Sequence, residues 1–130
     1  MVTPIFKLGL RHALLVASVV LMACDPCAPS HDAFTIGMSR SEILSKFGEP
    51  QQMQTLTKVN EPIWGPVEDI WSQVETGATI EIWSYDSCRT SAGNGRLSER
   101  QGQTELYFVN DSDEVSGIGF YIKGAVYEAS

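Results

Sequence analysis

Residues 36–50 read Ile-Gly-Met-Ser-Arg-Ser-Glu-Ile-Leu-Ser-Lys-Phe-Gly-Glu-Pro, and this stretch specifies a short helix at both ends. Ser39 followed by Glu42 three residues later is the capping-box pattern, in which each side chain satisfies a free backbone amide of the first turn. Gly48 suits the left-handed position after a helix, and Pro50 prevents the helix from continuing. We therefore predict a helix of about nine residues between these signals.

One face of this predicted helix is apolar. Ile43, Leu44 and Phe47 fall at helical spacing and form a single stripe. A helix this short is marginal in water on its own, so the stripe must dock on another part of the chain.

The rest of the chain predicts an antiparallel sheet with one further helix. Alternating apolar residues predict strands at 51–58, 79–85, 103–109 and 115–122. Between the first two strands, Val67, Ile70, Trp71 and Val74 follow helical spacing, so a second helix is expected over 65–77. Residues 88–102 are polar and contain three glycines, which predicts a long, mobile loop. The expected fold class is α+β, with short helices packed on a three- to four-stranded antiparallel sheet.

The first 23 residues have the layout of a secretory signal. Lys7 and Arg11 precede an apolar run over 13–23, which is about 11 residues and too short to cross a bilayer. We expect a signal peptide over 1–23, a tether over 24–35 and one domain over 36–130. An ordinary signal peptide or a short buried helix would also explain the apolar run, but neither requires the cysteine that follows it.

The charge of the chain excludes a nucleic-acid partner. Removal of Lys7 and Arg11 with the signal leaves 7 basic and 16 acidic residues, a formal charge of 7 − 16 = −9. Phosphate contacts need clustered Lys and Arg, which so acidic a chain does not supply. The net charge also does not draw the chain to anionic headgroups, so attachment to a membrane must come from lipid.

The end of the signal resembles the lipobox of bacterial lipoproteins. Leu21-Met22-Ala23-Cys24 places a small residue before a cysteine, and the resemblance implies cleavage before Cys24 and acylation of that residue. The two or three acyl chains of such lipoproteins meet the requirement of at least two for stable anchoring. We therefore expect a lipid-anchored protein of the Gram-negative envelope that faces the periplasm. Asp25 resembles an inner-membrane retention signal of enteric bacteria, so inner and outer membrane both stay open.

Two cysteines remain once Cys24 carries lipid. Exported chains meet an oxidising compartment, where an even pair tends to close, so we expect a Cys27–Cys88 disulfide. Two separate thiols are the alternative.

The predicted first helix carries a resemblance to a family. Gly37-Met38-Ser39, Ile43-Leu44 and Phe47-Gly48-Glu49-Pro50 resemble the opening motif of the SmpA/OmlA (BamE-like) lipoprotein domain. The resemblance covers 36–58 and 79–123, and it implies short helices against a three-stranded antiparallel sheet. The family includes a subunit of the outer-membrane β-barrel assembly machinery. The helix at 65–77 departs from the family and is expected to be an insertion.

Catalysis is not expected. The two histidines are His12 in the signal and His31 in the tether, so the predicted domain has no histidine base or ligand. Cys88 has no histidine to activate it as a nucleophile. We therefore expect no catalytic residues, no metal site and no cofactor.

A binding role is the leading hypothesis. Aromatic residues are numerous for so small a domain, and such side chains supply much of the energy at interfaces. The predicted contact surface is the sheet face of Trp83 and Tyr85 together with the 88–102 loop, which carries Arg89 and Arg96. We expect a membrane-tethered module that binds an envelope protein, in outer-membrane assembly or envelope maintenance. Packing of all these aromatics in the core is the structural alternative, and an enzyme inhibitor resembling a single β-lactamase-inhibitor unit is the functional one.

Overall fold

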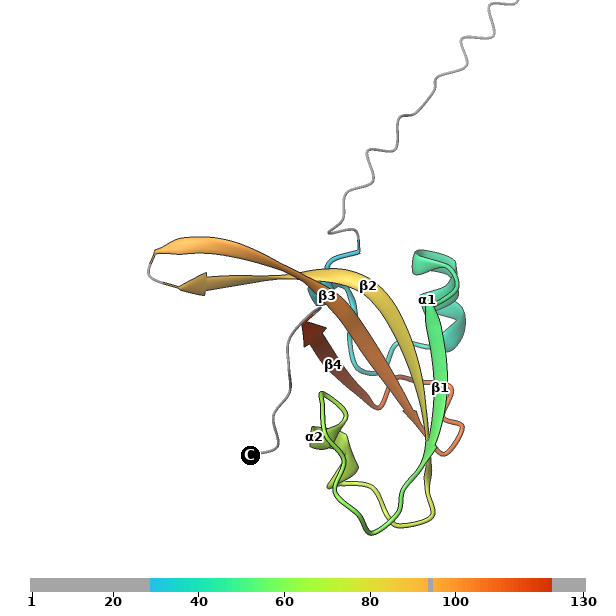
Figure 1. Ribbon diagram of the computed structural model, residues 1–130. Coiled ribbons are helices and arrows are strands. Elements are labelled where there is room, and N and C mark those ends of the chain that lie inside the picture. Colours follow the sequence, from blue (N-terminus) through green and yellow to red (C-terminus); the bar gives the residue numbers. More distant parts are fainter. Residues whose placement is uncertain (1–28, 94, 123–130) are drawn as a thin grey trace, which may run out of the picture.

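A four-stranded antiparallel sheet with one helix on each face organises the chain (Figure 1). The structure, a computed structural model, describes residues 29–93 and 95–122. The predicted signal peptide, Cys24 and Cys27 lie outside these residues. The elements in chain order are η1 (His31–Ala33), α1 (Arg40–Phe47), β1 (Gln52–Thr57), α2 (Glu68–Trp71), β2 (Thr79–Gly93), β3 (Arg96–Val109) and β4 (Gly117–Ile122). The strands lie in the order β1-β2-β3-β4, which confirms the α+β fold class.

Helix α1 begins and ends where its caps predict. The Ser39 Oγ accepts a hydrogen bond from the backbone N–H of Glu42 at 3.2 Å, and Gly48 follows the helix at φ 74°. The Glu42 carboxylate accepts from Lys46 Nζ at 2.9 Å, one turn further along the helix. No helix in the described part of the chain is long and apolar enough to span a bilayer.

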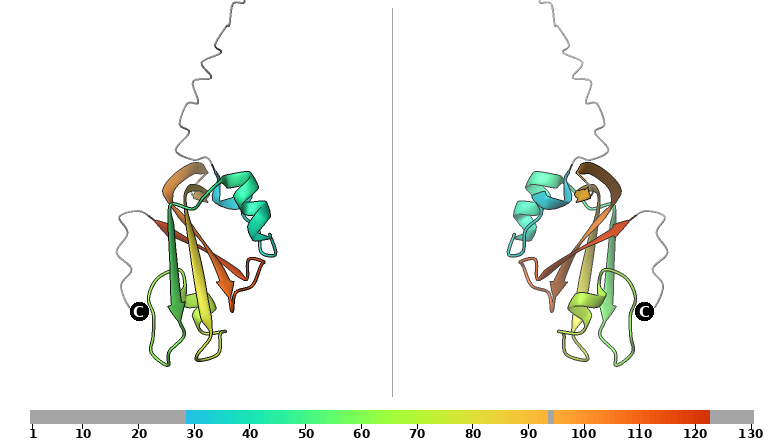
Figure 2. Two further views of the ribbon diagram at one scale, coloured as in Figure 1. Left: turned by 90° about the vertical axis from the view of Figure 1, so that its right-hand side faces the viewer. Right: turned by 90° about the vertical axis from the view of Figure 1, so that its left-hand side faces the viewer.

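The sheet buries a separate apolar cluster on each face, because successive side chains of β2 and β3 point to opposite faces and both faces are covered. Figure 2 shows α1 and α2 on opposite sides of the sheet. The cluster under α1 contains Phe34, Met38, Ile43, Trp83, Tyr85, Leu106, Phe108 and Val115. The cluster under α2 contains Val67, Ile70, Trp71, Ile80, Ile82 and Tyr107.

Helix α2 is shorter than the predicted 65–77 segment. Its expected apolar side chains at Val67, Ile70 and Trp71 are buried as the spacing predicts. In a longer helix, the carbonyl of Trp71 would accept a hydrogen bond from the backbone four residues later. Here Lys58 Nζ and the N–H of Val74 donate to that oxygen instead. The chain then turns at Gly77, at φ 92°, to reach β2.

The predicted loop over 88–102 is wrong, because these residues belong to a long β-hairpin. β2 and β3 pair without interruption from Ile80 opposite Val109 to Gly93 opposite Arg96. The distal half of this hairpin projects from the body of the domain (Figure 1). Backbone pairing rather than an apolar core therefore orders most of the region that was expected to be a loop.

The N-terminal segment joins the domain earlier than the predicted tether allows. Ser30 forms a parallel β-bridge with Cys88, at the point where β1 no longer covers the edge of β2. Phe34 is 4% exposed and stacks on Phe47 at 4.3 Å between ring centroids. Of the predicted 24–35 tether, the part from Ser30 onward is therefore integral to the fold.

Two glycines of β4 let the α2 segment pack closely on this strand, and they predict a graded loss of stability. A Cβ at Gly119 would lie 2.6 Å from Cβ of Pro66 and would overlap the buried Tyr107 hydroxyl. Gly119→Ala should therefore lower the free energy of unfolding by about 2 kcal/mol in urea denaturation. A Cβ at Gly117 would lie 2.9 Å from the terminal Cδ1 of Ile70 and 3.3 Å from Cδ2 of Tyr107, contacts less severe than those at Gly119, so Gly117→Ala should cost about 1 kcal/mol. Equal losses at the two positions would contradict this account of the packing.

Candidate functional site

The predicted contact surface at Trp83 and Tyr85 is wrong, because both side chains are in the core. Trp83 is 4% exposed and Tyr85 is 1% exposed. The Tyr85 hydroxyl donates to the carbonyl of Gly48 at 2.8 Å, which fixes the end of α1 on the sheet. Burial and the nearby negative charge of Glu49 raise the pKa of Tyr85 to about 12, so the hydroxyl remains a donor. These two residues support the fold and do not face a partner.

The other predicted site residues have mixed outcomes. Arg89 is exposed on the hairpin, whereas the side chain of Arg96 is outside the described part of the structure. Cys88 is 3% exposed and disulfide-bonded. Its partner lies outside the described residues, so the pairing with Cys27 stays a prediction.

A cleft lies at the β4 edge, between the N-terminal segment and the start of α2. Its volume is about 500 Å³. His31 and Arg89 line it together with Glu68 and Asp69 from the start of α2. Trp64 and Phe120 supply its aromatic surface, and Trp64 is 49% exposed. The cleft therefore combines both signs of charge with exposed aromatic area, which suits binding of a polar partner.

His31 is held in this cleft by a chain of hydroxyl groups. Its Nδ1 lies 2.9 Å from Oγ1 of Thr104, and that oxygen lies 2.6 Å from the Ser87 Oγ. The imidazole packs on Phe120 with the ring centroids 5.1 Å apart. The expectation that the folded region lacks a histidine is therefore wrong, because the segment assigned to the tether folds over the sheet.

The arrangement around His31 favours a structural role over a catalytic one. Thr104 and Ser87 are 0% and 1% exposed, so a substrate cannot reach their hydroxyl groups. In the described ranges, no three His, Cys, Asp or Glu side chains lie together in a way that could hold a metal ion. The hydroxyl chain instead fastens the N-terminal segment to β2 and β3.

Acidification should loosen this segment. Burial lowers the pKa of His31 and the positive charge of Arg89 lowers it further, while Asp32 partly opposes both. A histidine whose pKa is lower in the folded state contributes stability above its unfolded pKa of about 6.5, and this contribution is lost as pH falls through the folded value. We therefore expect the free energy of unfolding to decrease between neutral pH and pH about 5. His31→Gln should flatten this slope in urea titrations at the two pH values, and an unchanged slope would contradict the assignment.

Comparison with known proteins does not place the chain in a family. No family model, no curated protein and no solved structure matches it. The SmpA/OmlA resemblance therefore stays a prediction that depends on the motif residues alone.

Proposed function

We propose that this protein is a membrane-anchored lipoprotein of the bacterial envelope that binds a protein partner close to the bilayer. The observation that carries the proposal is the short distance along the chain between the lipobox-like cysteine and the fold. Only residues 25–29 separate Cys24 from Ser30, which already pairs with β2. The six Cα–Cα steps from Cys24 to Ser30 span at most about 22 Å, so acylation of Cys24 would hold the domain close to the membrane.

The disulfide at Cys88 supports the same arrangement. The chain has three cysteines, so the partner of Cys88 is either Cys24 or Cys27. Acylation of Cys24 leaves Cys27, and a bridge from Cys27 would fix the residue three positions beyond the lipid to β2. The two modifications are therefore compatible only with the Cys27–Cys88 pairing.

The cleft with Trp64 replaces the buried aromatics as the proposed contact surface. Tryptophan is enriched among residues that dominate binding energy, and a half-exposed tryptophan leaves much apolar area in water. The loop before α2 also exposes Val59, at 47%. A partner that covers Trp64 would place the acidic residues of α2 and the cationic Arg89 of β2 at the rim of the interface.

Two measurements on native membranes test the proposal. Mass spectrometry of the mature protein should find an acylated N-terminal Cys24, and cross-linking in cells should recover an envelope protein. Trp64→Ala should weaken this cross-link by about tenfold while the melting temperature changes little. Met53→Ala, which removes an equally exposed apolar side chain from β1 at 54% exposure, is the matched control and should leave the cross-link intact.

Two results would overturn the proposal. A native chain that begins at Met1 with an unmodified Cys24 would remove the anchor. Recovery of only lipid and copies of the protein itself, under mild detergent, would remove the partner.

A further inference from the structure

The long hairpin presents two arginines directly opposite each other. Arg89 on β2 pairs in register with Arg100 on β3, and opposite residues of an antiparallel pair project to the same face. Both side chains are exposed, and neither forms an ion pair or a hydrogen bond with the residues that the structure describes. Like charges at opposite positions repel, so the fold leaves an unfavourable pair that an anion would relieve.

The hairpin segment has a net positive charge, whereas the rest of the chain is acidic. Residues 88–102 contain three arginines and one acid, a formal charge of +2. The remainder of the chain from Cys24 onward contains four basic and fifteen acidic residues, a charge of −11. The expectation that the chain is not drawn to anionic headgroups depends on its net charge, and this arm carries a charge of the opposite sign.

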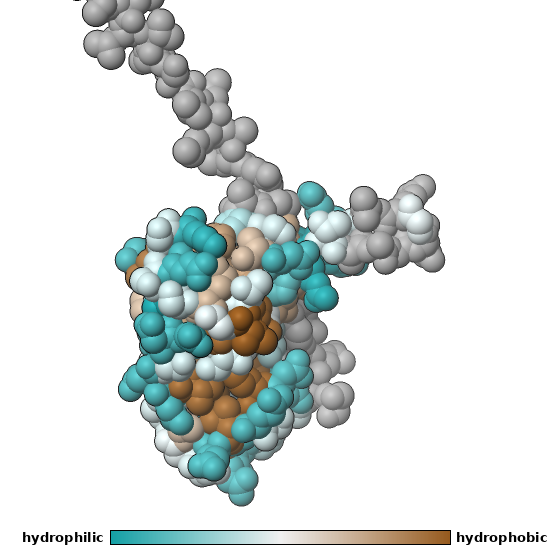
Figure 3. All heavy atoms as spheres, turned by 180° about the vertical axis from the view of Figure 1, so that it is seen from behind, coloured by the Kyte–Doolittle hydropathy of each residue, from teal (hydrophilic) through white to brown (hydrophobic). Residues whose placement is uncertain are grey.

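The two arginines line a partly apolar hollow. A cavity of about 290 Å³ is lined by Arg89, Thr90 and Arg100 together with Phe120 and Ile122 of β4. Seen from the side opposite to that of Figure 1, the coloured part of the projecting arm is hydrophilic to neutral, whereas apolar residues gather on the body (Figure 3). Two guanidinium groups that share a cavity with apolar side chains match the chemistry of a phospholipid, which carries a phosphate next to its apolar part.

The same end of the molecule receives the predicted anchor. Arg89 directly follows Cys88, which is disulfide-bonded and forms the β-bridge with Ser30. A disulfide joins Cα atoms about 6 Å apart, and the three residues from Cys27 to Cys24 add about 11 Å. A lipid on Cys24 would therefore lie within about 17 Å of the backbone next to Arg89.

We propose that the Arg89–Arg100 pair docks on the phosphate groups of anionic phospholipids in the membrane that holds the anchor. This inference rests on the proposed acylation of Cys24. The contact turns the acidic body away from the negatively charged surface and fixes the orientation of the domain. A membrane is favoured over an acidic protein because the tether keeps the arginines within reach of headgroups at all times.

The reactivity of Arg100 toward phenylglyoxal, an arginine-specific reagent, tests this contact. The native lipoprotein is reconstituted in vesicles of phosphatidylcholine alone, or of equal parts phosphatidylcholine and phosphatidylglycerol, and modification is followed by mass spectrometry. The modification rate should fall about fivefold in the anionic vesicles, which corresponds to roughly 1 kcal/mol for one arginine at such a surface. High salt should abolish the difference, because the attraction is screened.

Variants link the protection to the arginine pair. Arg89→Gln leaves Arg100 as a reporter and should remove most of its protection. Lys46→Gln removes one exposed positive charge from α1 and is the matched control, which should leave the protection of Arg100 unchanged.

The possible results separate this inference from the proposed function. A protein that does not float with either kind of vesicle lacks the anchor, and both proposals then fail. Flotation with equal reactivity of Arg100 in the two vesicles would overturn the docking alone. Protection by inorganic phosphate in neutral vesicles would assign a free-anion site, and protection found only in intact envelopes would assign a protein partner. Either of these last two results would also overturn docking on lipid.

Discussion

Replacing Cys88 with serine is expected to lower the free energy of unfolding by about 4 kcal/mol. Cys88 is disulfide-bonded, and a bridge to either of the two remaining cysteines closes a loop of about 60 residues. The cross-link removes conformations from the unfolded chain, and the chain-entropy estimate depends only on the logarithm of loop length. The size of the effect is therefore the same whichever cysteine is the partner. Urea denaturation without reductant measures it, and reduction of the unchanged protein should reproduce the loss.

The companion variant identifies the partner of Cys88. Cys27→Ser should cost as much as Cys88→Ser if the bridge is Cys27–Cys88, and the two changes together should cost no more than either alone. Full stability in Cys27→Ser would assign the bridge to Cys24. That result would also remove the acylation on which the envelope location depends, because one sulfur cannot carry both modifications.

The prediction from sequence was most accurate for features that depend on interactions within a few residues. Ser39, Gly48 and Pro50 define the ends of α1 through capping and backbone restrictions that act over a few residues. The inner halves of β2 and β3 are rich in apolar and aromatic residues because they bury side chains on both faces of the sheet, so their positions could be predicted from the sequence. The length of α2 was overestimated, because apolar spacing indicates which side chains are buried and not where the helix ends. The helix ends at Trp71, whose carbonyl accepts a hydrogen bond from Lys58 Nζ.

The sequence did not predict the long hairpin, because its distal half packs against no apolar core. Without burial, residues 88–102 show no apolar alternation, and their polar composition resembles a loop. The Asn94-Gly95 dipeptide was the available signal, since this pair strongly favours a two-residue turn between antiparallel strands. Strand pairing on either side of it would have extended both predicted strands.

The candidate site depends on contacts between distant parts of the chain, and no spacing rule reveals such contacts. Trp83 and Tyr85 were correctly assigned to one face of a strand, but the face that α1 covers is a tertiary property. His31 reaches Thr104 across 73 positions in the sequence. The buried Phe34 was the nearest clue that the chain before α1 folds onto the domain, because an isolated aromatic residue is unusual in a solvated tether.

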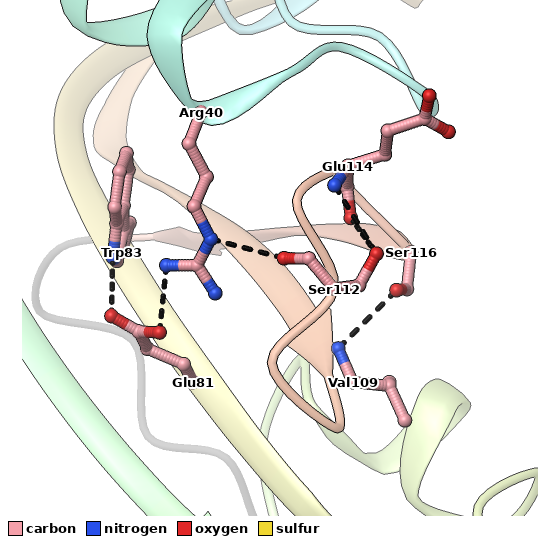
Figure 4. A network of polar contacts seen from close by, with 7 residues as sticks. All are labelled: Arg40, Glu81, Trp83, Val109, Ser112, Glu114 and Ser116. Atoms are coloured by element: carbon pink, nitrogen blue, oxygen red, sulfur yellow. Dashed lines mark hydrogen bonds and ion pairs between the residues drawn. The ribbon is translucent and has the colours of Figure 1, made fainter.

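Replacing Arg40 with alanine is expected to lower the free energy of unfolding by about 3 kcal/mol. Arg40 is the first residue of α1, and Figure 4 shows its guanidinium between β2 and the β3–β4 connection. Its Nη1 lies 2.7 Å from the Glu81 carboxylate, and its Nε donates to the carbonyl of Ser112 at 3.0 Å. The guanidinium carbon also lies 4.1 Å from the ring centroid of Phe108, so one side chain joins three separate elements by charge, hydrogen bond and stacking.

The expected loss of stability in Arg40→Ala is large because Arg40 and Glu81 are mostly shielded from water. The side chains of Arg40 and Glu81 are 20% and 22% exposed, so loss of the arginine leaves a carboxylate with little solvent. The Glu81 carboxylate would keep only the hydrogen bond from Trp83 Nε1, at 2.9 Å. Arg40→Lys is the matched control, because it keeps the charge but loses the planar fork and most of the stacking. It should lose about half as much stability as the alanine variant.

The Arg40–Glu81 ion pair should also make the free energy of unfolding depend on pH, and Arg40→Ala should remove this dependence. Burial raises the pKa of Glu81, but hydrogen bonds from Trp83 and Arg40 and the charge of Arg40 outweigh it, so the pKa lies below its ordinary value. A carboxyl with a lowered pKa contributes stability above its unfolded pKa of about 4.5, and the contribution disappears as pH falls through the folded value. The difference in unfolding free energy between the original protein and Arg40→Ala should therefore shrink when urea titrations are repeated below pH about 4. A difference that stays constant down to this pH would show that stacking on Phe108, and not the pair with Glu81, provides the stability.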